Sequence, residues 1–190
     1  MKSPTETEVK IRLSDRPAAV DRLQQLGFKV SVPRAFESNT IYDTGDQRLR
    51  QAGTILRLRQ VGSKAVITWK GAGEPGRHKS RQELETSIGS LEALHQILGK
   101  LGYDAAFRYE KYRTEFVRGD DGDSGVVTVD ETPIGNFLEL EGPGDWIDRT
   151  AKQLGFSEPE YILDSYGKLY IAECERRGLQ PTHMVFTSHP

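Results

Sequence analysis

Apolar and polar side chains alternate one by one through most of the chain. Val9, Ile11 and Leu13 alternate with charged residues in the first such segment, and the pattern returns in later ones. Successive side chains of a β-strand point to opposite faces of a sheet, so this alternation is typical of strands. It predicts strands at residues 5–13, 38–44, 54–61, 64–70, 79–88, 107–118, 124–131 and 135–142.

Short segments rich in turn-forming residues join several of these strands. Gly62 lies in one such segment, Pro133 lies in another, and residues 119–123 make a polar loop. Connections of this kind fit hairpins, which indicates that most neighbouring strands are antiparallel. A sheet of about eight strands can close on itself as a barrel.

Apolar residues three and four positions apart predict helices in the remaining segments. Three of these segments end in Leu-Gly followed by an aromatic residue, and glycine at that point is typical of a helix C-terminus. We predict helices from about Asp15 to Leu26, from Ser90 to Leu101 and from about Gly144 to Leu154. A fourth helical region is expected from Ser157 to Arg177, with a break near Gly167.

Length and composition narrow the range of functions. A chain of 190 residues favours one domain, which we place at residues 1–177, and the polar segment 178–190 is expected to be a loosely held tail. The 26 lysines and arginines balance 28 acidic residues, which argues against a general nucleic-acid partner. Apolar runs are too short for a membrane span, which argues against a membrane partner. With no secretory signal in the first residues and Cys174 as the single cysteine, we expect a cytoplasmic protein.

The polar face of the predicted strands carries ionisable side chains of both signs. A single Glu-x-Glu pair in a strand is usually a solvated face, but here three such pairs occur on separate strands together with Arg-x-Arg and Lys-x-Arg. If the helices cover the outside of the sheet, the apolar faces turn outward to meet them and the charged faces turn inward. The sequence then predicts an α+β fold, a closed eight-stranded antiparallel β-barrel with a charged interior and flanking helices.

A lumen lined by so many charges cannot be a dry core, because buried charges need partners that offset their desolvation. Its use would be to bind a small, highly charged ligand. A triphosphate carries roughly four negative charges near neutral pH and would contact lysines and arginines. Carboxylate oxygens suit a hard divalent cation such as Mg²⁺ or Mn²⁺.

These residues resemble those of the CYTH superfamily, the triphosphate tunnel metalloenzymes. The signature ExExK is present as Glu6-Thr7-Glu8-Val9-Lys10, and the resemblance extends to about Leu169. Residues 101–107 and 110–113 and the pair Ser165-Tyr166 are most similar to class IV adenylyl cyclases. The resemblance implies the same closed tunnel.

The resemblance also implies roles for individual residues. Divalent metal would be held by Glu6, Glu8, Glu83, Glu85, Asp130, Glu139 and Glu141. Phosphates would be bound by Lys10, Arg57, Arg59, Lys70, Lys111 and Arg113, and less clearly by Arg81 and Lys168, while Arg12 would lie at the rim. The candidate catalytic residues are Lys10, Glu8 and Glu139, although a general base is not identified. Candidate contacts for an adenine ring are Phe36, Tyr42 and Tyr166.

Three functions are compatible with this pattern. The first is a class IV adenylyl cyclase-like enzyme that converts ATP to cyclic AMP and pyrophosphate with Mg²⁺ or Mn²⁺. The second is a hydrolase of inorganic tripolyphosphate or thiamine triphosphate in the same tunnel. The third is a sensor that binds nucleotide or polyphosphate without turnover. A homodimer fits the habit of the family, but no residue requires it.

Overall fold

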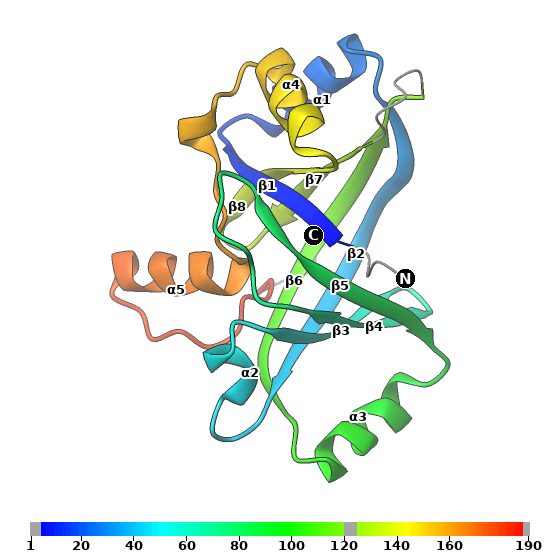
Figure 1. Cartoon of the computed structure of the whole chain (residues 1–190), viewed down its shortest axis with the longest axis vertical. Helices are drawn as coiled ribbons and strands as arrows, with labels where there is room; N and C mark the ends of the chain where they lie inside the picture. The colour runs from blue at the N-terminus through cyan, green and yellow to red at the C-terminus, as the bar shows by residue number, and fades with distance from the viewer. Residues whose placement is uncertain (1–4, 120–124, 188–190) are drawn as a thin grey trace.

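Eight antiparallel strands close into one barrel in the computed structural model, which describes residues 5–119 and 125–187. The strands are β1 (Thr5–Leu13), β2 (Lys29–Asp43), β3 (Ile55–Val61), β4 (Lys64–Lys70), β5 (Lys79–Ile88), β6 (Asp104–Val117), β7 (Val126–Thr132) and β8 (Gly135–Glu141). Around the barrel they run in the order β1-β5-β4-β3-β2-β6-β7-β8 (Figure 1). The predicted fold class is therefore confirmed. Residues 120–123 of the predicted loop and residue 124 lie outside the described residues.

Helices cover the outside of the barrel. They are α1 (Arg16–Gln25), α2 (Arg48–Gln51), α3 (Leu91–Lys100), α4 (Gly144–Leu154) and α5 (Tyr166–Arg177), with a 3₁₀ turn at Glu158–Glu160. The helices α1 and α4 lie together at one end of the molecule and α3 lies at the other end (Figure 1). The capping box at Ser157 belongs to the 3₁₀ turn, so the fourth helical region is interrupted before α5, and Gly167 lies inside α5.

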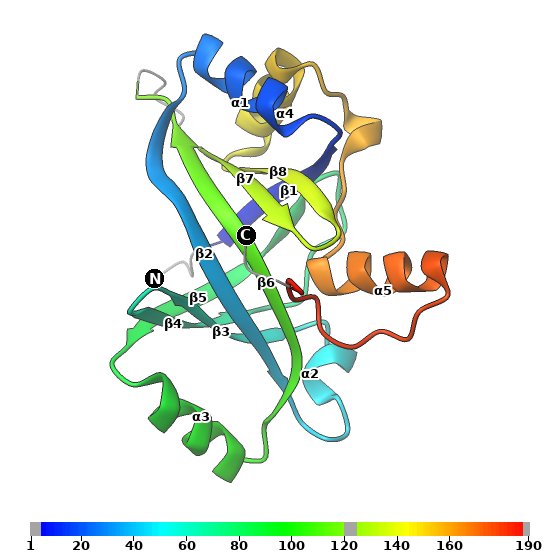
Figure 2. The same ribbon diagram turned by 180° about the vertical axis from the view of Figure 1, so that it is seen from behind.

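The strands β2 and β6 are longer than the alternation predicted. They run side by side along the length of the molecule (Figure 2), and the first part of β2 pairs with β6 but not with β3. Because this part has only one neighbour, Val30 and Val32 stay 50% and 39% exposed. Register shifts flank Val32 and break the simple alternation there. The short helix α2 was also not predicted; the carboxylate of Asp43 caps it by accepting hydrogen bonds from the backbone of Leu49 and Arg50.

The apolar core lies between the barrel and its helices rather than inside the barrel. Val9 and Ile11 of β1 and Leu138 of β8 pack with Trp146 of α4 in one cluster. Leu58 of β3 packs with Leu98 of α3 in another. Full burial of an aliphatic or aromatic side chain contributes about 1.5 to 3 kcal/mol, so this outer layer stabilises the fold while leaving the inner face free for charges.

The C-terminal segment is attached to the barrel as far as residue 186. Met184 is fully buried, its amide donates to the carbonyl of Arg108 at 3.0 Å, and its carbonyl accepts from the amide of Glu110 at 2.9 Å. The amide of Phe186 donates to the carboxylate of Glu110 at 3.0 Å. These bonds join part of the segment that we expected to be loosely held to β6. None of the helices in the described part of the chain has the length and apolar character needed to cross a membrane.

Candidate active site

A cavity of about 760 Å³ occupies the interior of the barrel, and all eight strands contribute to its wall. In the strands, the charged side chains that line the cavity occupy alternate positions and point to the inner face, as the alternation predicted. The predicted site residues that line the cavity are Glu6, Glu8, Lys10, Arg57, Arg59, Lys70, Arg81, Glu83, Glu85, Lys111, Arg113, Glu139, Glu141 and Lys168. The cavity therefore brings together most of the side chains that the sequence singled out.

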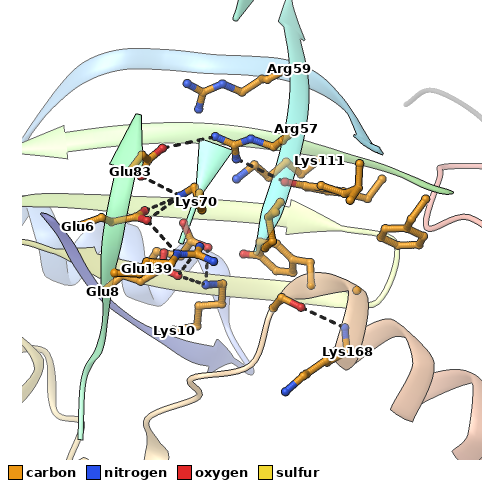
Figure 3. Close-up of a pocket in the computed structure, with 18 of the residues that line it drawn as sticks. Glu6, Glu8, Lys10, Arg57, Arg59, Lys70, Glu83, Lys111, Glu139 and Lys168 are labelled. Carbon is orange, nitrogen blue, oxygen red and sulfur yellow. Dashed lines mark hydrogen bonds and ion pairs between the residues drawn. The ribbon is translucent and has the colours of Figure 1, made fainter. Parts of the chain in front are cut away.

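The carboxylates gather where β1 lies between β5 and β8. The register sets Glu8 opposite Glu141 and Lys10 opposite Glu139. The ammonium of Lys10 lies between two of these acids, 3.1 Å from Glu8 and 3.2 Å from Glu139. Figure 3 shows Glu6, Glu8 and Glu139 on one side of the cavity, with Arg57 and Arg59 on the other.

Two lysines that come from neighbouring strands neutralise further oxygens of the acidic side. Lys70 of β4 is 2.7 Å from Glu6 and 3.0 Å from Glu83. Lys79 of β5 is 3.0 Å from Glu8. Each lysine thus bridges or flanks acids, which offsets the desolvation of those charges.

The pKa values of the neighbouring acids shift in opposite directions. Burial and the charge of Glu8 raise the pKa of Glu6, whereas the pKa of Glu8 is lowered because Lys10 and Lys79 outweigh its burial. Burial, with the charges of Glu6 and Glu8, raises the pKa of Glu141 to about 7. The pKa of Glu139 falls well below its usual range because Arg113 and Lys10 outweigh its burial. The site therefore holds acids with lowered pKa values beside acids with raised ones, and Glu141 titrates near neutral pH.

The cationic side is built on β3 and β6. The guanidinium of Arg57 donates to the hydroxyl groups of Thr68 at 3.1 Å and Tyr109 at 3.5 Å, and Arg59 is 3.2 Å from Glu85. Arg113 contacts Glu139 across the cavity. Guanidinium groups fit phosphate oxygens in pairs, so this side is suited to a polyphosphate.

Asp130, which the sequence predicted as a metal ligand, lies on β7 opposite Arg113 of β6. It is fully buried and does not line the cavity within the described residues. Its carboxylate accepts hydrogen bonds from Lys111 at 2.9 Å, from Arg113 at 2.6 and 2.7 Å, and from the hydroxyl of Tyr166 at 2.7 Å. Both oxygens of Asp130 are engaged by these donors, as those of the other acids are by their cations, and its role as a metal ligand stays a prediction.

Two cations that the sequence analysis treated as less certain lie at the edges. The side chain of Lys168 is 74% exposed and pairs with Asp164 at 3.3 Å, so it belongs to the rim. Arg12 points away from the cavity, because it donates to the carbonyl of Ile134 at 3.0 Å and lies over the ring of Phe137.

The sequence analysis missed Lys79 and Glu37. Lys79 shares the inner face with Arg81, and the alternation within the predicted strand 79–88 was a sufficient signal for it. Glu37 lies one residue before the predicted strand 38–44, so the boundary error hid it. Of the three aromatic candidates, Tyr42 and Tyr166 line the cavity. Tyr42 also packs in the core beneath α3, with its hydroxyl 2.6 Å from His95. Phe36 packs on Tyr112 and is not part of the cavity wall among the described residues.

The acidic side has the donor chemistry of a divalent metal site. Four carboxylates face the same cavity, those of Glu6, Glu8, Glu139 and Glu141. They supply only oxygen atoms, which are the ligands that Mg²⁺ and Mn²⁺ prefer. As these side chains stand, no three acidic groups of the described residues are arranged to enclose an ion. The reason lies in the ion pairs, since lysine and arginine nitrogens occupy the oxygens that a metal would use.

A closed barrel with charges inside and apolar faces outside defines a tunnel protein suited to anionic ligands. The chain belongs to the CYTH domain family, whose model matches residues 4–166. Enzymes of this family act on small triphosphate substrates with divalent metals.

Individual relatives agree with this assignment. A protein of Methanocaldococcus jannaschii that is provisionally named an adenylate cyclase is 30% identical over 136 residues, which cover 72% of this chain and 75% of the relative. A solved structure from Vibrio parahaemolyticus, also provisionally described as an adenylate cyclase, has a TM-score of 0.76 at 23% identity and covers 88% of this chain and 98% of its own. A Hippeastrum protein, described as an adenylyl cyclase candidate with a dominant triphosphatase activity, has a TM-score of 0.62 at 17% identity over 93% of this chain and 97% of its own.

Proposed function

We propose that this protein is a metal-dependent enzyme that converts ATP to cyclic AMP and pyrophosphate inside the barrel. The observation that carries the proposal is the division of the cavity into an acidic side on β1 and β8 and a cationic side on β3 and β6. A triphosphate between the two sides would contact the cations directly and would meet the acids through a metal.

The cationic side would bind and orient the phosphates. Arg57, Arg59, Lys111 and Arg113 come from two strands that are held in register by β2, so their spacing is fixed by the barrel. Phosphoryl transfer depends largely on positioning and on neutralising charge, and a rigid set of cations supplies both.

Lys10 would stabilise charge rather than act as a base. Burial lowers the pKa of its ammonium group, but Glu139 and Glu8 outweigh that effect and raise the pKa above its ordinary value. A lysine that keeps its proton can neutralise a developing negative charge on a phosphate oxygen. It cannot accept a proton from the ribose hydroxyl.

The acids Glu6, Glu8, Glu139 and Glu141 would hold Mg²⁺ or Mn²⁺. When bound, such an ion neutralises phosphate charge and orients the reacting oxygens. Binding requires these acids to exchange their lysine partners for the ion, and a proton held by Glu141 would leave at that step.

The surface near α5 favours a nucleotide over a bare polyphosphate. Phe107 stacks on Tyr109 with ring centroids 6.0 Å apart and lies 5.8 Å from Tyr170 of α5, and all three line the cavity together with Ile41. Apolar and aromatic groups give inorganic tripolyphosphate nothing to contact, whereas a nucleobase can stack on them. A nucleoside held here, with its phosphates among the cations, would direct the 3′-hydroxyl toward the α-phosphorus.

Hydrolysis of tripolyphosphate or another triphosphate is the alternative. The charged centre of the tunnel does not depend on the aromatic surface, and the Hippeastrum protein of similar fold is described as having a dominant triphosphatase activity. Water would then attack the terminal phosphorus in place of the ribose hydroxyl.

The test is to incubate the purified protein with Mg²⁺ or Mn²⁺ and either ATP or tripolyphosphate, and to separate the products. Cyclic AMP with pyrophosphate supports the cyclase, and orthophosphate from tripolyphosphate supports the hydrolase. Tight, metal-dependent binding without turnover of either substrate would indicate a sensor and would refute both.

Two variants tie the activity to the acidic side. Glu8→Gln and Glu139→Gln should each abolish metal-dependent turnover and leave the barrel folded, whereas the control Glu92→Gln on the exposed side of α3 should behave as wild type. Full activity in either tunnel variant would reject the metal site.

A further inference from the structure

A carboxylate of β2 lies among the phosphate-binding cations, as Asp130 of β7 does, and not on the acidic side. Glu37 of β2 is opposite Lys111 of β6, is 5% exposed, and does not belong to the cavity wall among the described residues. Its Oε2 atom is 3.6 Å from the ammonium of Lys111 and makes no hydrogen bond to any other described residue. The negative charge therefore stands behind the cations as seen from the cavity.

The surroundings of Glu37 keep it ionised. Burial alone would raise the pKa of its carboxyl group, but the charges of Lys111, Arg113, Arg59 and Arg57 outweigh burial and lower the pKa. These four cations are the ones that face the cavity from β3 and β6. They repel one another, and the negative charge of Glu37 offsets part of that repulsion, in addition to Asp130, which pairs with Lys111 and Arg113.

Asn39 continues the same inward face two residues further along β2. It is opposite Arg59 of β3 and Tyr109 of β6 and is completely buried. Neither atom of its amide has a hydrogen-bond partner among the described residues. A buried amide without a partner is uncommon and destabilising. As the neutral isostere of aspartate, Asn39 keeps a second negative charge out of this position.

We propose that Glu37 is a positioning residue that holds the phosphate-binding cations together and limits their affinity for the triphosphate, while Asn39 keeps a further negative charge out of this part of β2. The inference rests on the proposed function. A bound triphosphate competes with Glu37 for the same cations, so Glu37 weakens the binding of substrate and of pyrophosphate alike. It thereby favours product release without touching the ligand.

Two isosteric substitutions change this charge in opposite directions. Glu37→Gln removes the negative charge, and Asn39→Asp adds one. Ser38→Ala, between them on the outer face, is the matched control. Binding of tripolyphosphate is measured by calorimetry on the metal-free protein at low and high salt, and KM and kcat for the active substrate are measured with Mg²⁺.

Glu37→Gln should bind tripolyphosphate about three- to tenfold more tightly than wild type at low salt, and Asn39→Asp should bind it more weakly by a similar factor. The difference should shrink at high salt, because exposed ligand charges are screened. Glu37→Gln should also lower KM and lower kcat, since products leave more slowly and the cations are less well held. If Glu37 had a purely structural role, Glu37→Gln would change the melting temperature but would not lower KM and kcat together.

Binding constants of both variants within twofold of wild type, or shifts of both in the same direction, would overturn the inference. If Glu37→Gln does not fold, Asn39→Asp and the charge-conserving Glu37→Asp carry the test, with weaker binding expected for the first and wild-type affinity for the second. Wild-type protein that binds no triphosphate would refute the proposed function and this inference with it. Wild-type protein that binds and turns over normally, with variants unchanged, would refute only this inference.

Discussion

The protonation of Glu141 should make the stability of the metal-free protein depend on pH. Burial, with the charges of Glu6 and Glu8, raises the pKa of this carboxyl group to about 7 from the ordinary value of 4.5. A raised pKa means that the folded state binds a proton that the unfolded chain releases. The contribution of Glu141 to the free energy of unfolding should therefore be fully present below about pH 4.5 and should be lost as the pH rises through 7.

The size of this effect follows from the two pKa values. A difference of that size is worth roughly 3.4 kcal/mol at about 1.36 kcal/mol per unit of pKa. The tunnel walls surround Glu141, but more than a third of the residue is exposed to solvent at the mouth, and screening reduces the effect. We expect a change of about 1 to 2 kcal/mol between pH 4.5 and pH 8.

The assay compares wild type with Glu141→Gln by urea unfolding in the presence of a chelator, at several pH values. From pH 4.5 to pH 8 the free energy of unfolding of the variant should rise relative to that of wild type by about 1 to 2 kcal/mol, because the glutamine has no proton to lose. Glu175→Gln on the exposed side of α5 is the control and should run parallel to wild type. If the free energy of unfolding of Glu141→Gln ran parallel to that of wild type across the pH range, the neighbouring acids would not raise the pKa of Glu141.

Addition of Mg²⁺ extends the same experiment to the metal site. An ion that binds only the folded state stabilises it by an amount that grows with its concentration. Wild type at pH 8 should therefore regain stability in excess Mg²⁺, while Glu141→Gln should regain less. Equal gains in the two proteins would remove Glu141 from the proposed metal ligands.

Three further substitutions test other parts of the tunnel. Arg57→Ala should weaken the binding of tripolyphosphate by about tenfold or more, measured by calorimetry, because it removes a charged donor from the cationic side; unchanged affinity would contradict that role. Tyr166→Phe should lower the free energy of unfolding by about 1.5 to 3 kcal/mol, measured in urea, because its hydroxyl donates to the buried carboxylate of Asp130; a loss below about 0.5 kcal/mol would show that the bond adds little. Met184→Ala should speed amide exchange at Glu110 by about thirtyfold, the equivalent of about 2 kcal/mol, because it empties a fully buried position; unchanged exchange would show that the tail is held by its backbone bonds alone.

The inner face of the tunnel could be predicted from sequence because alternation assigns side chains to faces without any knowledge of distances. Glu6, Glu8 and Lys10 share a face in any strand that contains them, and the same holds for Arg57 and Arg59. The direction of that face followed from one further step, since the apolar positions needed helices to cover them. The barrel confirms that step, because Val9 and Leu138 pack outward.

Partners across strands could not be predicted in the same way. Asp130 shares the inner face with Glu139, and the family resemblance implied metal binding for both. The pairing of β6 with β7 sets Arg113 opposite Asp130, and this register shows which cations bond to the carboxylate. Register between strands depends on long-range packing, which the local pattern of one strand does not contain.

The predicted strand ends were wrong for a related reason. The first part of β2 has exposed valines and register shifts, so neither burial nor alternation marked it as a strand. Glu37 lies where this irregular part joins the regular one, and its role became visible only with the contacts of Lys111. The contacts of Met184 could not be predicted because one buried methionine among polar residues makes no periodic signal.

Acids and bases neutralise one another inside the tunnel, so ligands compete with these ion pairs for the same side chains. Lys70 bridges Glu6 and Glu83, and Lys10 bridges Glu8 and Glu139, so a metal that takes these acids leaves both lysines without partners. Those lysines then become available to phosphate oxygens. Likewise, a triphosphate that takes the lysines leaves the acids free for a metal. Because each ligand creates the partners of the other, their affinities should be coupled, and by thermodynamic reciprocity each should strengthen the other by the same factor.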